Sequence, residues 1–271
     1  MGLPEADWIG FCRRAGAAAR DAVASYSTRA ERSVEAGRGE GGDMSYVIDR
    51  ASEDAIFAEL EALGVPVTAV SEERGEVAIH GGGPARVVID PVDGSVNAKR
   101  GLPYACVSIA VASGERLADV ELAWVAELAP SGGHAGVTVR DWWALRGEGA
   151  FVAGERLPQL EPGPLEILGL ETARPRLVAA VAHALAGLEA RRIRALGSVA
   201  SSLCLVAAGQ LDAMVTLREV RSVDIAAAQL LVRECGGALA VPGGDALDLE
   251  MRSRAAAART PELVERLLGL F

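Results

Sequence analysis

The segment at residues 86–97, RVVIDPVDGSVN, constrains the fold more than any other part of the chain. Its apolar run predicts a buried β-strand that ends at Asp90. Pro91 prevents regular continuation of the strand, and Gly94 permits a tight turn directly afterwards. We therefore expect Asp90 and Asp93 to converge on one point at the tip of a strand that emerges from the core.

Two carboxylates held that close repel each other unless a cation lies between them. With no His or Cys nearby, hard oxygen ligands favour Mg²⁺ or Mn²⁺ over zinc. Two more acidic groups follow the same pattern, because Glu72 and Glu73 come just after a predicted strand and Asp224 begins a predicted helix. Taken singly, a turn, a solvated loop and a helix N-cap explain these residues equally well. Only their combination and order favour a functional site.

Composition excludes several classes of protein. The chain has 271 residues, enough for one large domain or two closely packed ones. Its 27 Lys and Arg against 37 Asp and Glu give a net charge of −10, the opposite of what a general nucleic-acid binder carries. The longest strongly apolar stretch has the length of a strand, so no membrane span is predicted. The scattered cysteines and the absence of a basic leader favour a cytoplasmic protein: Cys12, Cys106, Cys204 and Cys235.

Helix and strand patterns alternate along the chain, which predicts mixed α and β layers. Residues 27–43 are polar and glycine-rich, and we expect a mobile loop there. Its part from Ala36 to Asp43 is expected to order when metal and substrate bind. The remaining predicted elements are helices at 4–26, 49–63, 177–188, 198–208 and 224–235, and strands at 65–70, 86–89, 105–112 and 211–217. Ser198 is expected to cap the helix that follows it.

The ordered motifs resemble the inositol monophosphatase superfamily of Mg²⁺-dependent, lithium-sensitive sugar and inositol phosphatases. DPVDGSVN is similar to the family's D-P-[IVL]-D-G-[TS]-x-N motif throughout, and VDIAAAQLLVRECGG is similar to its W-D-x-A…E-x-G-G motif, with Val223 in place of Trp. The chain also carries SEE, an Asp49-to-Glu53 D-x-x-x-E pattern, and GSVASSLCLVAAGQLDAMV, which is similar to the family's G-S/T-A-A…A-x-G-x-L-D stretch.

The resemblance implies a role for each matching position. Glu72, Asp90, Asp93 and Asp224 would be side-chain ligands of two or three Mg²⁺ or Mn²⁺ ions, with the Val92 carbonyl completing the first site. Asp49 and Ser95 would orient and activate the attacking water, so the implied catalytic residues are Asp49, Glu72, Asp93 and Ser95. The backbone N–H groups of Gly94 and Ser95 open a helical turn that can hold phosphate oxygens. Further substrate contacts are implied for Asp93 and Gly197.

The resemblance also implies a fold, an assembly and a substrate class. It predicts an α+β protein with the layered α/β/α/β/α sugar-phosphatase fold, divided at 1–145 and 146–271, and a homodimer. The substrate would be a small phosphorylated polyol or sugar, with inositol-1-phosphate and fructose-1,6-bisphosphate as the leading candidates.

The stretch REVRSVD is closest to the archaeal-type bifunctional fructose-1,6-bisphosphatase/inositol monophosphatase group. Arg192, Arg194 and Arg218 are therefore candidates to hold a second phosphate, each against the alternative of a plain surface charge. Lys99 is expected to be a solvated residue at the rim. A 3′(2′),5′-bisphosphate nucleotidase, a histidinol-phosphate phosphatase and a non-catalytic regulatory binding protein of the same fold remain alternatives.

Overall fold

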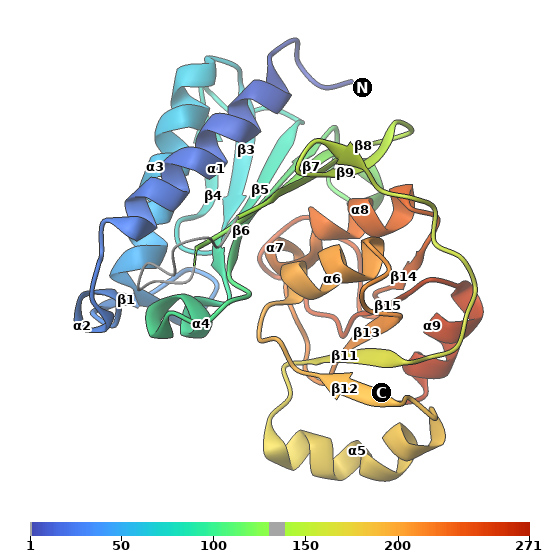
Figure 1. The fold of residues 1–271 in the computed structure, drawn as a ribbon. Coiled ribbons are helices and arrows are strands. Elements are labelled where there is room, and N and C mark those ends of the chain that lie inside the picture. The colour runs from blue at the N-terminus through green and yellow to red at the C-terminus, as the bar shows by residue number, and fades with distance from the viewer. Residues whose placement is uncertain (1, 130–138) are drawn as a thin grey trace.

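Two β-sheets separated and flanked by helices form the molecule in the computed structural model, which describes residues 2–129 and 139–271. The layers run α1 and α3, first sheet, α6 and α8, second sheet, and finally α5 and α9 (Figure 1). This arrangement confirms the predicted layered α/β/α/β/α fold.

The first sheet has eight strands in the order β10-β9-β8-β7-β6-β5-β3-β4. Most neighbouring strands are antiparallel, but β3 and β5 are parallel, with Ser71 level with Ile89. Both strands therefore reach the same edge of the sheet, where Glu72 follows β3 beside Asp90. The strand expected to end at Asp90 continues past Pro91 to Asp93, with an irregular register between Asp90 and Asp93. The strands are β3 (Val67–Ser71), β4 (Gly75–Ile79), β5 (Arg86–Asp93), β6 (Cys106–Ala112), β7 (Val120–Glu127), β8 (Asp141–Leu145), β9 (Gly149–Val152) and β10 (Glu155–Arg156).

The helices of the N-terminal half cover the outer face of this sheet. The spacing of Phe11, Cys12, Ala15 and Ala19 places these side chains on one buried face of α1 (Trp8–Ala24), which packs on α3 (Val47–Leu63) and on the sheet. Gly64 adopts a left-handed conformation with φ 74° and ends α3, as the sequence predicts. A short helix α4 (Ser95–Arg100) follows β5, and a 3₁₀ turn (Leu117–Asp119) precedes β7.

The second sheet has the order β12-β11-β13-β15-β14. Its elements are β11 (Ile167–Glu171), α5 (Pro175–Gly187), β12 (Arg192–Arg194), α6 (Val199–Ala207), β13 (Ala213–Thr216), α7 (Ser222–Ile225), α8 (Ala228–Glu234), β14 (Ala238–Ala240), β15 (Ala256–Ala258) and α9 (Pro261–Leu268). One buried cluster joins α6 and α8 to both sheets, so the two halves share a single apolar seam.

The structure corrects the expectation for residues 27–43. This segment contains α2 (Arg29–Arg32) and β1 (Glu35–Arg38), and β1 forms a hairpin with β2 (Met44–Tyr46). Polar residues can pack here because Arg32 is buried and donates hydrogen bonds to the Tyr26 and Ser27 carbonyls at 2.9 and 3.0 Å. Whether the segment from Ala36 to Asp43 orders on ligand binding stays a prediction.

Two further expectations differ in detail from the structure. The helix expected at 224–235 begins earlier and is divided into α7 and α8. The expected boundary at 145/146 falls between β8 and β9 of the first sheet, and the chain passes to the second sheet between Arg156 and Ile167. No helix in the two described ranges is long and apolar enough to cross a bilayer.

Candidate active site

The DPVDGS motif occupies the end of β5 and the turn that follows it. The Asp90 Oδ1 atom accepts a hydrogen bond from the Val92 N–H at 3.0 Å, and the Ser95 hydroxyl donates to the Val92 carbonyl at 2.9 Å. Gly94 has φ 88°, and a Cβ atom there would lie 2.7 Å from the Tyr104 carbonyl oxygen. Only glycine fits this position, so the turn depends on the residue that the sequence places there.

Asp93 reaches across the seam to the first turn of α6. Its Oδ2 atom accepts hydrogen bonds from the Ser198 hydroxyl at 2.7 Å and from the Ala200 N–H at 2.6 Å. Ser198 also caps α6, as predicted, through the Ser201 N–H. One carboxylate of the first sheet is thereby fixed to a helix of the second half.

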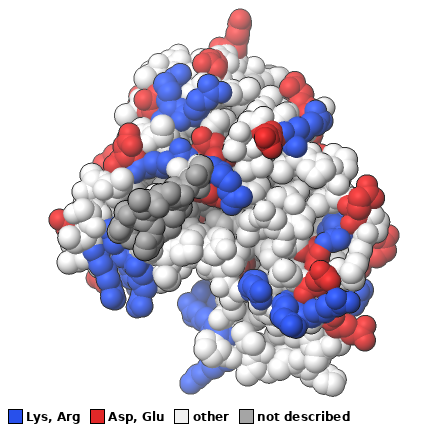
Figure 2. Space-filling view, in the orientation of Figure 1, with Lys and Arg blue, Asp and Glu red and all other residues white. Residues whose placement is uncertain are grey.

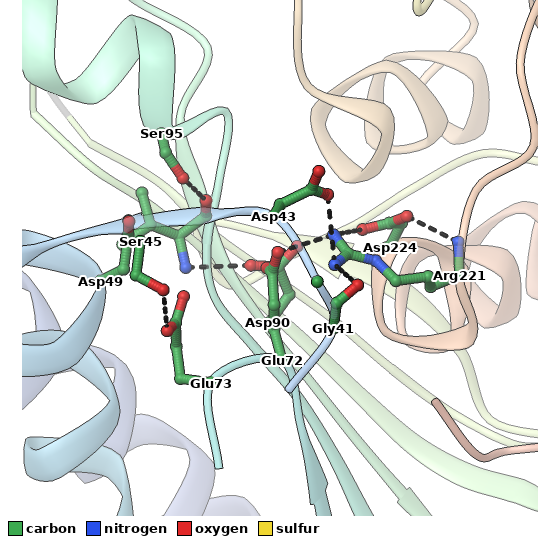
Figure 3. Close-up of polar contacts among 12 residues, drawn as sticks. Gly41, Asp43, Ser45, Asp49, Glu72, Glu73, Asp90, Ser95, Arg221 and Asp224 are labelled. Atoms are coloured by element: carbon green, nitrogen blue, oxygen red, sulfur yellow. Dashed lines mark hydrogen bonds and ion pairs between the residues drawn. The ribbon is translucent and has the colours of Figure 1, made fainter. Parts of the chain in front are cut away.

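Asp224 supplies a carboxylate from the second half close to Glu72 and Asp90 (Figure 3). Its Oδ2 atom accepts a hydrogen bond from the Arg221 N–H at 2.7 Å, in the first turn of α7. The Arg221 guanidinium extends beside it, with Nη2 2.7 Å from Glu72 Oε1 and 3.4 Å from Asp224 Oδ1. An arginine that sequence reasoning assigned no role thus bridges carboxylates of both halves.

The carboxylates are close enough to raise one another's pKa. Burial raises the pKa of Asp90 well above its usual range, and the charges of Glu72, Asp93 and Asp224 add to the rise. Burial, together with the Asp224 charge, raises the pKa of Asp93 to about 7. Burial raises the pKa of Glu72 to about 8 although Arg221 opposes it. Glu72, Asp90 and Asp93, whose pKa values are raised, therefore form with Asp224 a site that needs positive charge.

Asp49 lies at the start of α3 on the opposite side of the turn. Its Oδ2 atom accepts a hydrogen bond from the Tyr46 N–H at 2.7 Å, whereas its buried Oδ1 atom has no hydrogen-bond partner among the described residues. Burial raises the pKa of Asp49 to about 7, with the nearby Glu73 charge adding to the rise and the Ser95 hydroxyl opposing it. A buried carboxylate oxygen without a partner is costly unless something else satisfies it.

A cleft of about 390 Å³ opens beside the carboxylates, between the two halves. Of the residues singled out from the sequence, Asp93, Gly197, Arg218 and Asp224 line it. Glu72, Asp90, Val92 and Ser95 are not among the described residues that line it: Asp90 and Val92 are buried, whereas Glu72 and Ser95 are partly exposed. The rest of the wall comes from the hairpin tip and the second half: Gly41, Gly42, Asp43, Glu171, Thr172, Val199, Glu219, Val220, Arg221 and Arg252.

Two arginines give this cleft a cationic wall. The Arg218 guanidinium has no hydrogen-bonding or ion-pair partner within the described ranges, and that of Arg252 donates to the Leu249 and Met251 carbonyls only. The Arg218 N–H donates to Thr172 Oγ1 at 2.8 Å, and Thr172 adopts a left-handed φ of 53° that β-branched residues rarely take. On the face that Figure 2 shows, basic and acidic side chains are otherwise interspersed.

Three basic residues lie elsewhere than the sequence suggested. Arg192 is exposed on β12, and neither it nor Arg194 is among the described residues that line the cleft. Lys99 is half-buried, with its Nζ atom 4.0 Å from the centre of the Tyr46 ring and 2.5 Å from the Tyr46 hydroxyl. It fastens α4 to the end of the hairpin, so the expectation of a solvated rim residue is wrong.

Glu171 is the second residue that the sequence did not reveal. It ends β11, is 1% exposed, and accepts hydrogen bonds from the Leu196 N–H, the Gly197 N–H and the Ser202 hydroxyl at 3.0, 2.8 and 2.7 Å. Its carboxylate holds the loop that carries Gly197, where φ is 84°. A lone glutamate at a strand end carries no motif, so no signal in the sequence identified it.

The donor set suits a hard divalent cation. Glu72, Asp90, Asp93 and Asp224 all supply carboxylate oxygen, which fits Mg²⁺ or Mn²⁺. Within residues 2–129 and 139–271, no three acidic, His or Cys side chains already surround one point in the manner of metal ligands. The Arg221 guanidinium is instead the cation that contacts Glu72 and Asp224 here.

Comparison with known proteins identifies the family of this chain. The model of the inositol monophosphatase family matches residues 7–271. The chain belongs to the inositol monophosphatase family. The match covers almost the whole sequence, including every motif on which the resemblance was based.

The chain is similar in sequence to named proteins from archaea and bacteria. The chain is 32% identical over 248 residues to a fructose-1,6-bisphosphatase/inositol-1-monophosphatase of Methanothermobacter thermautotrophicus, covering 85% of this chain and 84% of the relative. It is 33% identical over 230 residues to the Nus factor SuhB of Pasteurella multocida, covering 82% and 80%. A crystal structure of an inositol monophosphatase-fructose 1,6 bisphosphatase superposes with a TM-score of 0.81 at 25% identity, covering 98% of this chain and all of that one.

Proposed function

We propose that this protein hydrolyses the phosphate monoester of a small sugar or polyol with the help of bound divalent cations. Membership of the inositol monophosphatase family and relatives named as phosphatases make the chain an enzyme of the phosphatase class. The observation that carries the proposal is the meeting of Glu72, Asp90 and Asp93 from one half with Asp224 from the other, beside a cleft with an arginine wall.

In this proposal Glu72, Asp90, Asp93 and Asp224, with the Val92 carbonyl, would hold Mg²⁺ or Mn²⁺. Divalent cations held by such a site make a water molecule more acidic and stabilise negative charge on phosphate oxygens.

The remaining groups of the turn handle the proton and the phosphate. Asp49 is suited to accept the proton of the attacking water, because its Oδ1 atom has no hydrogen-bond partner within the described ranges and its pKa is raised to about 7. The hydroxyl of Ser95 stands beside it and can orient that water. The N–H groups of Gly94 and Ser95, at the start of α4, would donate hydrogen bonds to the phosphate oxygens. The proton thus moves to the Asp49 carboxylate while the phosphate is held by backbone donors.

Arg218 and Arg252 lack carboxylate partners within the described ranges, which supports a substrate with a second phosphate, such as fructose-1,6-bisphosphate. A guanidinium in that state can bind a second phosphate through two parallel hydrogen bonds. One charge-assisted hydrogen bond contributes about 1.5–3 kcal/mol. Arg218→Ala is therefore expected to lower kcat/KM for the bisphosphate by about ten- to a hundredfold and to leave inositol-1-phosphate nearly unchanged.

Phosphate release from a panel of substrates tests the proposal. The panel contains inositol-1-phosphate, fructose-1,6-bisphosphate, a 3′,5′-bisphosphate nucleotide and histidinol phosphate, each with Mg²⁺ and with EDTA. We expect Mg²⁺-dependent release from the first two. Preference for the nucleotide or for histidinol phosphate would replace the substrate assignment, and release from none would favour a binding role such as that of the Nus factor relative.

Arg218→Ala and Arg252→Ala are compared with Arg191→Ala, which removes an exposed arginine that pairs with Glu166 on the surface. Equal losses on both substrates would mean that Arg218 is structural or contacts the scissile phosphate. No loss on either would make it an ordinary surface arginine.

A further inference from the structure

Arg221 occupies a position that is unusual for an arginine. Its side chain is 11% exposed, and its Nη2 atom lies 2.7 Å from Glu72 Oε1 and 3.4 Å from Asp224 Oδ1. Both carboxylates are among the four proposed ligands of the divalent cation. The other end of the guanidinium faces the hairpin tip, with Nη1 3.4 Å from Asp43 Oδ2 and 3.4 Å from the Gly41 carbonyl oxygen.

The surroundings are shaped around this guanidinium. A Cβ atom on Gly41 would collide with Nη1, and a Cβ atom on Gly39 would lie 2.9 Å from the Glu72 carbonyl oxygen. The Gly41 N–H donates to that same carbonyl at 2.9 Å. The glycines of the tip therefore let the hairpin close over Glu72 with Arg221 between them (Figure 3).

We propose that Arg221 is the protein's own counter-ion for the carboxylate cluster, and that a divalent cation binds only by displacing it from Glu72 and Asp224. The inference rests on the proposed function in one respect, since it needs Glu72 and Asp224 to be metal ligands. Arg221 then sets both the affinity of the site for the cation and its selectivity for charge.

The selectivity follows from simple electrostatics. A guanidinium carries one positive charge, so a monovalent ion that replaces it gains no additional attraction to the carboxylates. A divalent ion brings twice the charge to the same oxygens, and its attraction to each carboxylate is about doubled at equal distance. When the guanidinium leaves the carboxylates, its contacts with Gly41 and Asp43 remain available, so the hairpin tip can stay attached to it.

Titration calorimetry of Mg²⁺ into the protein without substrate tests this inference. Arg221→Gln removes the charge but keeps hydrogen-bonding capacity, so Mg²⁺ no longer has a cation to displace. We expect the Mg²⁺ dissociation constant to fall by about tenfold or more, equivalent to about 1.4 kcal/mol. Arg74→Gln is the matched control, because Arg74 lies in the same loop as Glu72 and its Nε atom is 3.2 Å from Oε2 of Glu53, a buried residue of α3 that is not a proposed ligand. Its Mg²⁺ affinity should stay within about twofold of the unmodified protein.

Thermal unfolding provides a second readout that does not depend on activity. Without Mg²⁺, Arg221→Gln should unfold at a lower temperature than the unmodified protein, because buried carboxylates lose their counter-ion. Saturating Mg²⁺ should remove most of that difference. Arg221→Lys, which keeps one charge on a flexible stem, covers the case in which the glutamine variant does not fold, and its Mg²⁺ affinity should lie between the other two.

The outcomes separate the two claims. If the unmodified protein binds no Mg²⁺, the metal assignment fails and the inference fails with it. If it binds Mg²⁺ and Arg221→Gln binds Mg²⁺ equally well or more weakly, the metal assignment stands and the role of Arg221 is refuted. Selectivity is tested by exchanging tetramethylammonium chloride for sodium chloride at constant ionic strength. Sodium should weaken Mg²⁺ binding in Arg221→Gln but not in the unmodified protein, and an equal effect on both would refute the selectivity.

Discussion

Replacement of Glu171 by glutamine tests whether the loop beside the cleft is held by one buried carboxylate. The carboxylate is 1% exposed, and its two oxygens accept three hydrogen bonds at 2.7 to 3.0 Å. Gln keeps the shape of the side chain but replaces one oxygen by an NH₂ group. In either orientation of the amide, that NH₂ faces a backbone N–H, either of Gly197 or of Leu196.

The cost follows from the buried donors. A buried donor left without an acceptor costs about 1–3 kcal/mol. At about 2–4 °C per kcal/mol for a protein of this size, a loss of about 2 kcal/mol lowers the melting temperature by about 4–8 °C. Activity should fall as well, because the Asn97 side-chain amide donates to the Leu196 carbonyl at 2.7 Å and thereby ties α4 to the same loop.

Calorimetry and steady-state kinetics measure the two effects. Glu166→Gln is the control, since Glu166 is a largely exposed partner of Arg191 and such surface pairs contribute about 0–1 kcal/mol. We expect the control to have the melting temperature and the steady-state rate constants of the unmodified protein. A Glu171→Gln protein that melts within about 1 °C of the unmodified one would refute the argument, because less than about 0.5 kcal/mol would then be at stake.

Three further predictions address the site itself. Asp93→Asn keeps the size of the side chain but removes a charge, so Mg²⁺ affinity and kcat/KM should collapse, and activity within about threefold of the unmodified enzyme would contradict the assignment. Because burial raises the pKa of Asp93 to about 7 and of Glu72 to about 8, the folded protein binds more protons than the unfolded chain between about pH 4 and 8. The free energy of unfolding without metal should therefore fall as the pH rises through this interval, and urea denaturation that shows the opposite trend would rule the shifts out. Trypsin cleavage after the exposed Arg38, followed by mass spectrometry, should slow when Mg²⁺ and phosphate are both present, and unchanged cleavage would argue against an ordering hairpin.

Local chemistry made the DPVDGS turn predictable from the sequence. Pro91 and Gly94 act on their own neighbours, so the convergence of Asp90 with Asp93 needs little knowledge of the rest of the fold. The position of Glu72 depends instead on the parallel pairing of β3 with β5, and apolar runs of this kind do not specify which strands pair or in which register. Glu171 contacts residues that are distant in sequence, and so does Arg221 apart from its contact with Asp224; for that reason the pattern of residues does not reveal their roles.

Composition was misleading where a short motif would have helped. The polar composition of the segment after Ser27 predicts a loop, whereas Thr28 and Glu31 form a capping box at the start of α2. The T-x-x-E spacing was present in the sequence and is typical of a helix N-terminus. The metal, the homodimer and the cytoplasmic location stay predictions.

The strained Thr172 marks a conflict between heat resistance and substrate binding. A β-branched residue with φ 53° costs the fold on the order of 1–3 kcal/mol, and its hydroxyl positions the Arg218 backbone. An engineer who seeks a more thermostable variant would replace Thr172 by glycine, which accepts this conformation without strain. That change would also release the loop that presents Arg218 to the cleft. Selection for thermostability alone should therefore favour glycine at this position, whereas selection for turnover of a bisphosphate should keep threonine.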